Sequence, residues 1–461
     1  MLSTTLAPQP TQPVTTPAPA DLPLRAVFEQ LQRTRTEPAW LRAARRKALE
    51  HFEQTGYPTL RDEDWRFTSV APVAALPFRP ASTSFASQFS AAALARLPFH
   101  GLEGDRLVFV DGHFVPELSQ IAHRTDGVVV TSLATALAHQ PEDLEPHLVR
   151  HARADDNAFA ALNQAFFTDG AFIRVPAGRV VAAPIRLVFL ASGREPDVTI
   201  CLRNLVLVEA GAQATVLEHS TSLDGATHVT NCVTELVTGD RAVVEHLKFQ
   251  DDNARAFHVA GFHARIGRSV KLLAHSFALG ARLARFHVRA GLHGEGAEAV
   301  LNGLYLANRE RLADHHMIVD HARPQCASHE YYNGILSDRA RGVFHGRILV
   351  QPGAQKTDAK QTNKNLLLSD EATVDTKPQL EIYADDVKCT HGATVGQLHP
   401  EQIFYLRARG IPEEMARQML IHAFAGEIID RVRCAPVREE LDRLIWDRLE
   451  QQEHLGLGAH D

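Results

Sequence analysis

The stretches LVLVEAGAQATVLEH (205–219) and CVTELVTGDRAVVEHLKF (232–249) decide the fold of this 461-residue chain. In each stretch, two short runs rich in Val and Leu flank a turn that contains a glycine, Gly211 in the first and Gly239 in the second. Short apolar and β-branched runs bounded by turn residues are typical of β-strands. We therefore predict two strand–turn–strand units whose turns are 28 residues apart.

The same kind of turn recurs along the middle of the chain. Its glycines stand at positions 178, 211, 239, 267, 296 and 353, so the successive separations are 33, 28, 28, 29 and 57. The last separation is about twice the regular step, which indicates one coil, near Gln325, without its glycine. A fixed period of roughly 20–50 residues indicates stacked supersecondary units, and helical patterns are nearly absent here. Residues 169–396 are therefore predicted to form a mainly β solenoid, a parallel β-helix.

An antiparallel sandwich or barrel is the alternative architecture, because its hairpins can also be evenly spaced. Hairpin turns usually recur about every 8–12 residues, however, whereas the turns of this chain recur at the much longer step given above. The period therefore favours the solenoid.

Helical patterns flank the predicted solenoid on both sides. Residues 1–20 are rich in Pro, Thr and Ala and are expected to be a disordered leader. Residues 21–168 are expected to form an N-terminal helical domain with one small hairpin, RLVFVDGHFVPEL (106–118), that turns at Asp111-Gly112. Residues 397–461 are expected to form a C-terminal helical domain.

The C-terminal domain contains amphipathic helical patterns. Pro400 and Pro412 stand where a first helical position is expected, since proline is well tolerated there. One apolar face collects Met415, Met419, Leu420, Ala423, Phe424, Ile428 and Ile429, and a later pattern contributes Leu441, Leu444, Ile445 and Leu449. Such a module can cap the end of a solenoid and can also offer a helix face to another protein.

Composition and charge limit the classes of partner. The net charge is −7, so no global basic field attracts nucleic acid or an anionic membrane. No run of about 18 apolar residues occurs, so no membrane-spanning helix is expected. The N-terminus lacks the basic and apolar regions of a signal peptide, and the five cysteines are widely spaced without a C-x-x-C. These features argue against disulfides and a four-cysteine zinc site, and we expect a cytoplasmic protein.

The sequence motifs of several common enzyme classes are missing from the chain. It has no G-x-x-x-x-G-K-[ST] phosphate-binding loop, no G-x-S-x-G and no H-E-x-x-H. Glycines 291, 294 and 296 do not have the spacing of a dinucleotide-binding loop. We therefore expect a non-catalytic protein that has no ATP site of its own.

Histidine is frequent, with 25 residues. The densest cluster consists of residue types that bind transition metals, namely Asp314, His315, His316, Asp320, His321, Cys326 and His329. In a strand, His315 and Met317 share one face and His316 lies on the other, so strand geometry is expected to split this cluster. Whether residues 314–345 bind a metal stays open from the sequence.

A different pattern appears in GAQKTDAKQTNKNLLLSDEATVDTKPQLEIYADDVKCTHGATVG (353–396), which is dense in polar residues although it lies within the predicted β-region. Cys389 and His391 stand two apart, so on a strand both side chains point the same way. A thiol beside an imidazole can be held as a thiolate, which serves as a nucleophile or a soft metal ligand. A buried, inert cysteine next to a hydrogen-bonded histidine is the structural alternative.

The 353–396 stretch closely resembles the C-terminal signature of the SufB/SufD family of iron–sulfur cluster assembly scaffolds. Further stretches are similar to the same family, namely EDWRFTSV (63–70), FVDGHFVPELS (109–119), VDHARPQCASHEYYNGILSDRARGVFHGRI (319–348) and YLRARGIPEEMARQMLIHAFAGEI (405–428). The resemblance extends over nearly the whole chain.

Within this family the chain resembles the SufD branch. SufB members are expected to carry an acceptor cysteine in the segment that matches QTNKNL (361–366), which holds no cysteine here. They also have a glutamate in a His-Glu-Ala-Thr motif, where this chain reads His-Gly-Ala-Thr (391–394). SufB members often have an N-terminal cysteine motif, whereas the first cysteine here is Cys201. These departures argue against independent cluster-building chemistry in this chain.

The resemblance implies a right-handed parallel β-helix flanked by helical domains, together with several partners. It implies pairing with a SufB-type sister scaffold through the β-helix ends, and it leaves open a homodimer of the isolated chain. It implies that the C-terminal helices bind a SufC-type ABC ATPase, through the face that carries Met415, Met419, Leu420, Phe424 and Ile428.

The resemblance also implies a site for iron–sulfur chemistry. His391 would face a cysteine of the SufB partner and help to hold a nascent iron–sulfur cluster or iron, and Cys389 would be a supporting ligand. Both contacts would be transient and shared with the partner. Reduced flavin is associated with assembled complexes of the family, and no residue of this chain is assigned to it.

Two functions from other classes are kept as alternatives. A secreted-type β-helix carbohydrate-active enzyme needs clustered carboxylates on one solenoid face, whereas Asp385 and Asp386 are adjacent and point to opposite faces on a strand. A stand-alone metal-binding protein would use the histidine-rich region. Anaerobic iron titration of the isolated chain distinguishes these possibilities.

Overall fold

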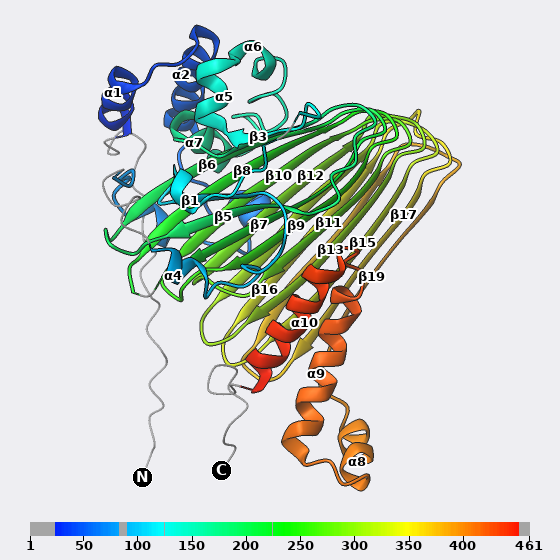
Figure 1. Ribbon diagram of the computed structural model, residues 1–461. Coiled ribbons are helices and arrows are strands. Elements are labelled where there is room, and N and C mark those ends of the chain that lie inside the picture. Colours follow the sequence, from blue (N-terminus) through cyan, green and yellow to red (C-terminus); the bar gives the residue numbers. More distant parts are fainter. Residues whose placement is uncertain (1–23, 83–89, 124, 224, 451–461) are drawn as a thin grey trace.

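The computed structural model describes residues 24–82, 90–123, 125–223 and 225–450, and Figure 1 shows it as a ribbon. The predicted leader, 1–20, lies outside these residues. A long stack of strands forms the middle of the molecule, N-terminal helices gather at one end of it, and the C-terminal helices α9 (Glu413–Ile429) and α10 (Ala435–Glu450) lie along one side.

The strands of the described residues form two sheets, and successive strands of the solenoid enter the two sheets alternately. The ten-stranded sheet has the order β19-β17-β15-β13-β11-β9-β7-β5-β1-β2, and the nine-stranded sheet has the order β18-β16-β14-β12-β10-β8-β6-β4-β3. From β4 onward all pairings between these strands are parallel. The predicted β-solenoid is therefore confirmed, and the antiparallel alternative is excluded.

The bounds of the strands are β1 Arg106–Val110, β2 His113–Phe114, β3 Val129–Ser132, β4 Ala171–Val175, β5 Ile185–Ala191, β6 Val198–Val208, β7 Gln213–Ser222, β8 His228–Thr238, β9 Val243–Asp251, β10 Phe257–Ile266, β11 Lys271–Ala278, β12 Leu283–Leu292, β13 Glu298–Ala307, β14 Leu312–His321, β15 Ala327–Leu336, β16 Arg341–Val350, β17 Asp358–Leu367, β18 Thr373–Ile382 and β19 Lys388–Gly396.

The strand register gives the length of each coil directly, as the distance in sequence between paired residues. From β5 onward, the sequence distance between paired residues is smallest from Phe257 of β10 to Leu283 of β12. It is largest from His345 of β16 to Lys377 of β18. The other coils fall between these two lengths. The period predicted from the turn glycines lies inside this narrow range and is therefore confirmed.

One turn residue in each of seven coils has the left-handed backbone conformation, but glycine occupies only some of these positions. Gln325, in the coil that lacks its turn glycine, has φ 58°. Gly239 and Gly267 are absent from the positive-φ positions, and the left-handed residue follows each of them by two. A Cβ on Gly239 would lie 2.5 Å from the backbone nitrogen of Ala210, so close packing of coils requires that glycine. At this series of turns the left-handed residues are Gly178, Gly211, Arg241, Ser269, Gly296, Gln325 and Lys356, and other turns of the solenoid have their own, at Asp197, Ala281, Arg309 and Asp338.

The main core fills the space between the two sheets, and the helices cover the outer faces. Ile428 of α9 and Leu441 of α10 pack with Leu304 and Ile335 on the outside of the ten-stranded sheet. N-terminal helices cover the first strands of the nine-stranded sheet. The remaining helices are α1 Leu24–Thr34, α2 Ala39–Thr55, the 3-10 helix η2 Glu63–Trp65, α3 Ala71–Ala74, α4 Ala91–Leu94, the 3-10 helix η4 Pro116–Leu118, α5 Leu133–His139, α6 Pro141–Leu144, α7 Ala158–Phe166 and α8 Pro400–Ala408.

The hairpin and the first helix of the C-terminal region form where the sequence predicts them. The hairpin forms at Asp111-Gly112, where both residues have positive φ as a tight hairpin turn requires. Its first strand, β1, also pairs in parallel with β5, which joins the hairpin to the solenoid. Pro400 is the first residue of α8 as predicted, but Pro412 precedes α9 as its N-cap, so that prediction is wrong by one residue. Among the helices of the described residues, none has the length and apolarity needed to span a bilayer.

Candidate functional site

The solenoid ends on two strands whose outer edges have no partner among the described residues. β18 terminates the nine-stranded sheet and β19 terminates the ten-stranded sheet. In β19 only Cys389 is half-buried and the other residues are exposed, whereas alternate side chains of the preceding strand β17 are buried. An exposed strand edge offers backbone donors and acceptors to a further strand. This end of the molecule is therefore suited to continue into another chain.

Cys389 and His391 lie on the same side of β19, as strand alternation predicts. Cys389 pairs with Ala359 and His391 with Gln361, and both of those β17 residues are buried in the solenoid interior. Cys389 packs against an apolar cluster that includes Ile348 and Val350. His391 lies in line with the interior-facing side chain of Gln361, but it is exposed because no later coil among the described residues covers it. The pair therefore lies at the open mouth of the solenoid interior.

The environment of Cys389 favours the neutral thiol. Burial raises its pKa, and the carboxylate of Asp358 raises it further. The thiolate that the C-x-H pattern suggests is thus disfavoured in the isolated chain. A metal ion that binds this sulfur must displace its proton, so binding at Cys389 becomes weaker as the pH falls.

A polar column inside the solenoid leads to His391, and sequence reasoning missed it. Glu330 of β15, Gln361 of β17 and His391 of β19 occupy one register position in successive coils. The Nε2 of Gln361 donates to Oε2 of Glu330 at 2.5 Å. Burial raises the pKa of Glu330 to about 7, although the hydrogen bond from Gln361 opposes this. The signal that could have found the column is the recurrence of a polar residue at intervals close to the coil period.

Amide side chains surround this column. Asn363 donates from Nδ2 to the carbonyl oxygen of Tyr332 at 3.1 Å, and Asn365 donates to Oδ1 of Asn363 at 2.7 Å. The hydroxyl of Tyr305 donates to Oδ1 of Asn365. The segment QTNKNL (361–366) thus places alternate side chains inside the solenoid, where they form a hydrogen-bonded polar layer beneath the open end.

The residues expected to bind an ATPase occupy different environments on α9. Met415 and Met419 are each 37% exposed, and Leu420 and Phe424 are partly buried. Ile428 is 1% exposed and belongs to the core between α9 and the solenoid, so it is not available to a partner in this conformation. The exposed apolar surface instead extends to α8, where Phe404 is 72% and Tyr405 58% exposed.

The histidine-rich cluster is split by strand geometry, as predicted. His315 faces the solenoid interior between the rings of Tyr305 and Tyr332, whereas His316 lies on the outer face of β14. Burial holds the pKa of His316 well below its ordinary value, and nearby Arg285 adds to this effect. Burial also lowers the pKa of His345 on the next strand of this face. Both shifts favour the neutral form of these two imidazoles.

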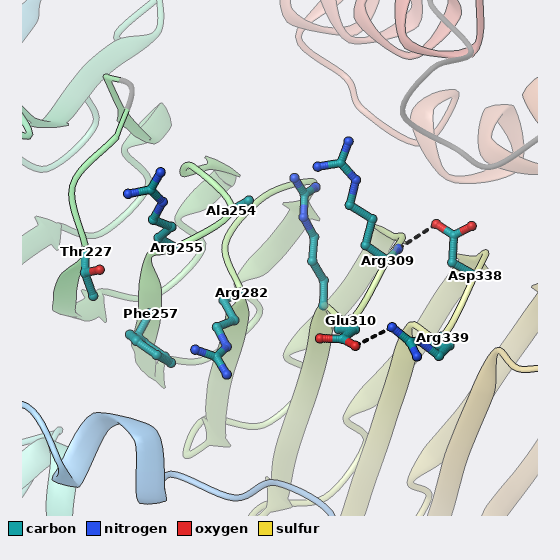
Figure 2. Close-up of a pocket in the computed structure, with 10 residues that line it drawn as sticks. Thr227, Ala254, Arg255, Phe257, Arg282, Arg309, Glu310, Asp338 and Arg339 are labelled. Carbon is teal, nitrogen blue, oxygen red and sulfur yellow. Dashed lines mark hydrogen bonds and ion pairs between the residues drawn. The ribbon is translucent and has the colours of Figure 1, made fainter.

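A cavity of about 820 Å³ opens beside the turns that lead into β10, β12, β14 and β16. Figure 2 shows the side chains that line it. Glu310 pairs with Arg339 at 2.5 Å and Asp338 accepts from the backbone N–H of Arg309. Five arginines and two carboxylates line the cavity, so positive charge is in excess and the cavity can attract an anion. The lining includes neither Cys389 nor His391. The five arginines are Arg255, Arg282, Arg309, Arg311 and Arg339.

Comparisons with known proteins agree with this geometry. Residues 189–424 match the family model of the SUF system FeS cluster assembly SufBD core domain, and residues 26–187 match that of the SufBD protein N-terminal region. An iron–sulfur cluster assembly SufBD family protein of Synechocystis is 33% identical over 92% of this chain and 95% of its own length. The iron–sulfur cluster assembly protein SufD of Escherichia coli is 34% identical over 87% of this chain and 92% of its own.

A more distant relative extends the same pattern. The iron–sulfur cluster assembly protein SufD of Bacillus subtilis is 26% identical over 89% of this chain and 94% of its own length. The two family matches cover most of the chain and meet near β5, close to the start of the regular coils. The parallel solenoid, the polar segment 353–396 with Cys389 and His391, and the SufD relatives together place this chain in the SufBD family of iron–sulfur cluster assembly proteins, as a member of the SufD type.

Proposed function

We propose that this chain is a non-catalytic scaffold subunit of a SUF iron–sulfur cluster assembly complex in the cytoplasm. It pairs with a SufB-type sister scaffold through the open solenoid end formed by β18 and β19. At that interface His391, with Cys389 as a supporting ligand, contributes to a shared transient site for a nascent cluster or iron. The observation that carries the proposal is the exposure of His391 at the mouth of the solenoid interior, on a strand edge that is unpaired within the described part of the chain.

The chemistry of the two side chains supports a shared site. Imidazole nitrogen and cysteine sulfur are both ligands for iron, but two ligands leave a coordination sphere incomplete. A sister chain that continues the strand stack at β18 and β19 can supply the missing ligands. Reduced flavin remains part of the proposal for the assembled complex, without a residue assigned in this chain. When the sister scaffold is absent, the same edge is proposed to pair with a second copy of this chain.

The His391→Ala variant tests the shared site. We expect the variant to assemble with the sister scaffold and the ATPase as the wild type does, because the His391 side chain is exposed and its loss leaves no buried void. We expect cluster formation by the complex to fall by roughly tenfold or more, the size of effect seen when a metal site is disturbed. Anaerobic reconstitution of the co-purified complex, followed by visible absorption, measures this.

Thr390→Ala is the matched control, since Thr390 is the exposed neighbour on the other side of β19. Normal cluster formation in His391→Ala, or an equal loss in Thr390→Ala, would contradict the site assignment. Cys389→Ser is expected to give a smaller loss than His391→Ala.

The ATPase is proposed to bind the exposed apolar side of α8 and α9. Deleting residues 400–461 does not test this cleanly, because Ile421 and Ile428 cover apolar residues of the solenoid. The variant Phe404→Asp/Met419→Asp changes only exposed side chains. Loss of an interface anchor of about 2 kcal/mol or more weakens binding about 30-fold, and we expect at least that change in the dissociation constant for the SufC-type subunit.

Leu60→Asp provides the control for the docking variant. Leu60 is 54% exposed and lies between α2 and η2, on the N-terminal side of the molecule. The Leu60→Asp variant should bind the ATPase like the wild type in surface plasmon resonance or pull-down. Unchanged affinity of the Phe404→Asp/Met419→Asp variant would exclude this surface as the docking site.

A further inference from the structure

Three histidines form a ladder on the outer face of the nine-stranded sheet. His287 of β12 pairs in register with His316 of β14, which pairs with His345 of β16. The ring centroids of His287 and His316 are 5.3 Å apart, and those of His316 and His345 are 4.3 Å apart. The ladder advances by one full coil at each step, so one imidazole falls in each of three consecutive coils.

The short helix η2 brings a carboxylate to this ladder from a distant part of the sequence. Oδ1 of Asp64 lies 3.6 Å from Nε2 of His316. Asp64, His316 and His345 each offer one ligand atom, and these atoms lie within 4.8 Å of one another. Within the described residues this is the one group of three or more such side chains with that spacing. Small side-chain shifts bring all three atoms to bonding distance from one ion.

Neighbouring charges explain why His287 is not part of this group. Nε of Arg285 donates to Nε2 of His287 at 2.7 Å, so that nitrogen is already occupied. Arg285 is ion-paired with Asp314, and its Nη2 donates to the carbonyl oxygen of Asp64 at 2.6 Å. The guanidinium therefore holds the backbone of η2 against the sheet and positions Asp64 over His316.

Carboxylates pair with the cations that surround the site. Arg285 is offset by Asp314, and Lys377, the next residue of the ladder, is 2.6 Å from Glu63. The Asp64 carboxylate makes no ion pair with a Lys or Arg among the described residues, although the charge of Arg285 acts on it. Arg347 also acts on His316, and it lies 3.7 Å from Glu381. Nε2 of His345 lies 3.4 Å from Oε1 of Gln379, a contact that competes with an ion at that nitrogen. A second contact opposes binding at His316, since Nη2 of Arg285 is 3.3 Å from its Nδ1. A cation at Nε2 puts the imidazole proton on Nδ1, so this contact must lengthen, while Arg285 keeps its other partners.

We propose that Asp64, His316 and His345 form a binding site for one divalent first-row transition metal ion. Two imidazole nitrogens and one carboxylate oxygen are the ligand set that such ions prefer over Ca²⁺ and Mg²⁺. The Asp64 side chain is 50% exposed, so solvent reaches the site and water completes the coordination sphere. The site needs no partner chain. It is separate from the pair Cys389 and His391, which lies on the other sheet and faces the solenoid interior.

Titration of the full chain with Co²⁺ under anaerobic conditions tests this proposal. Co²⁺ reports its ligands through visible ligand-field bands and through paramagnetically shifted imidazole resonances. We expect one ion per chain and shifted resonances from two histidines. Asp64→Asn, His316→Ala and His345→Ala should each weaken Co²⁺ binding by at least about tenfold, since even changes outside the ligand set commonly have effects of that size.

Two controls distinguish this site from the other histidines of the chain. His329→Ala removes a half-exposed histidine that lies 3.9 Å from Asp358, and it should leave Co²⁺ binding unchanged. Cys389→Ser/His391→Ala removes the proposed cluster site and should also leave this binding unchanged, so the two proposals fail independently. Binding that survives Asp64→Asn and His345→Ala, or that is lost in His329→Ala, would overturn the assignment. Circular dichroism of Asp64→Asn checks the fold, and this variant changes only an exposed group.

Discussion

Replacing Glu235 with alanine is expected to lower the free energy of unfolding by about 3–5 kcal/mol, the effect of removing one partner of a buried ion pair. Glu235 and Arg203 are both fully buried, and Nε of Arg203 donates to Oε1 of Glu235 at 2.8 Å. Burial alone raises the pKa of Glu235, but Arg203 and backbone N–H groups outweigh it and hold the pKa below its ordinary value. The substitution leaves the Arg203 charge buried without its counter-ion. Urea denaturation followed by circular dichroism measures the loss.

Glu235 also ties the N-terminal helical region to the solenoid. Its carboxylate accepts from the backbone N–H groups of residues 149, 150, 151 and 152. The double variant Arg203→Leu/Glu235→Leu is therefore not expected to recover wild-type stability, since these donors stay unpaired. Arg268→Ala removes an exposed pair with Asp240 and should cost at most about 1 kcal/mol. A loss in Glu235→Ala no larger than in this control would refute the role of the buried pair.

The Glu330→Gln variant is expected to remove a pH dependence of stability. In the folded chain the pKa of Glu330 is raised from 4.5 to about 7, whereas the unfolded chain loses the proton near the ordinary value. Between these two pH values the folded state binds more protons, so wild-type stability falls as the pH rises through this window and is level above it. The shift corresponds to a loss of about 3 kcal/mol. Glutamine keeps the size and the acceptor for Gln361 but has no proton to lose.

Denaturation at several pH values from 4.5 to 8 tests this prediction. The stability of Glu330→Gln relative to the wild type should increase across this range by about 3 kcal/mol, with most of the change below pH 7. Glu310→Gln, at an exposed ion pair with Arg339, should show no comparable trend. A constant difference between Glu330→Gln and the wild type at all pH values would show that Glu330 is not protonated in the folded chain.

The solenoid could be predicted from the sequence because its pattern is local and repeated. Each coil needs short apolar strands and a turn, and these recur at nearly the same step whatever lies around them. The backbone conformation of the turns was harder to predict from the sequence. Arg241, Ser269, Gln325 and Lys356 have left-handed backbone conformations, which these residue types rarely adopt, so their identities did not predict them. Gly239, by contrast, is needed for close approach to Ala210 rather than for its φ angle.

The candidate sites also combine features that the sequence predicts with features that only the tertiary structure sets. Strand alternation correctly predicts that Cys389 and His391 share one face and that His315 and His316 do not. The exposure of His391 depends on the absence of a further coil above β19 among the described residues, which only the stacking order shows. Likewise, the apolar pattern of α9 does not distinguish Met419, which is exposed, from Ile428, which packs on the solenoid.

The sequence by itself therefore determined the parallel β-solenoid, its period, its family and the position of Cys389 and His391 on one strand face. The tertiary structure decided which residues from distant coils meet. Glu330, Gln361 and His391 form one interior column, and Asp64 joins His316 and His345, only because strand register aligns positions one coil apart and a short helix crosses the outer face. Strand alternation acts between neighbouring residues, whereas register is set by the stacking of whole coils.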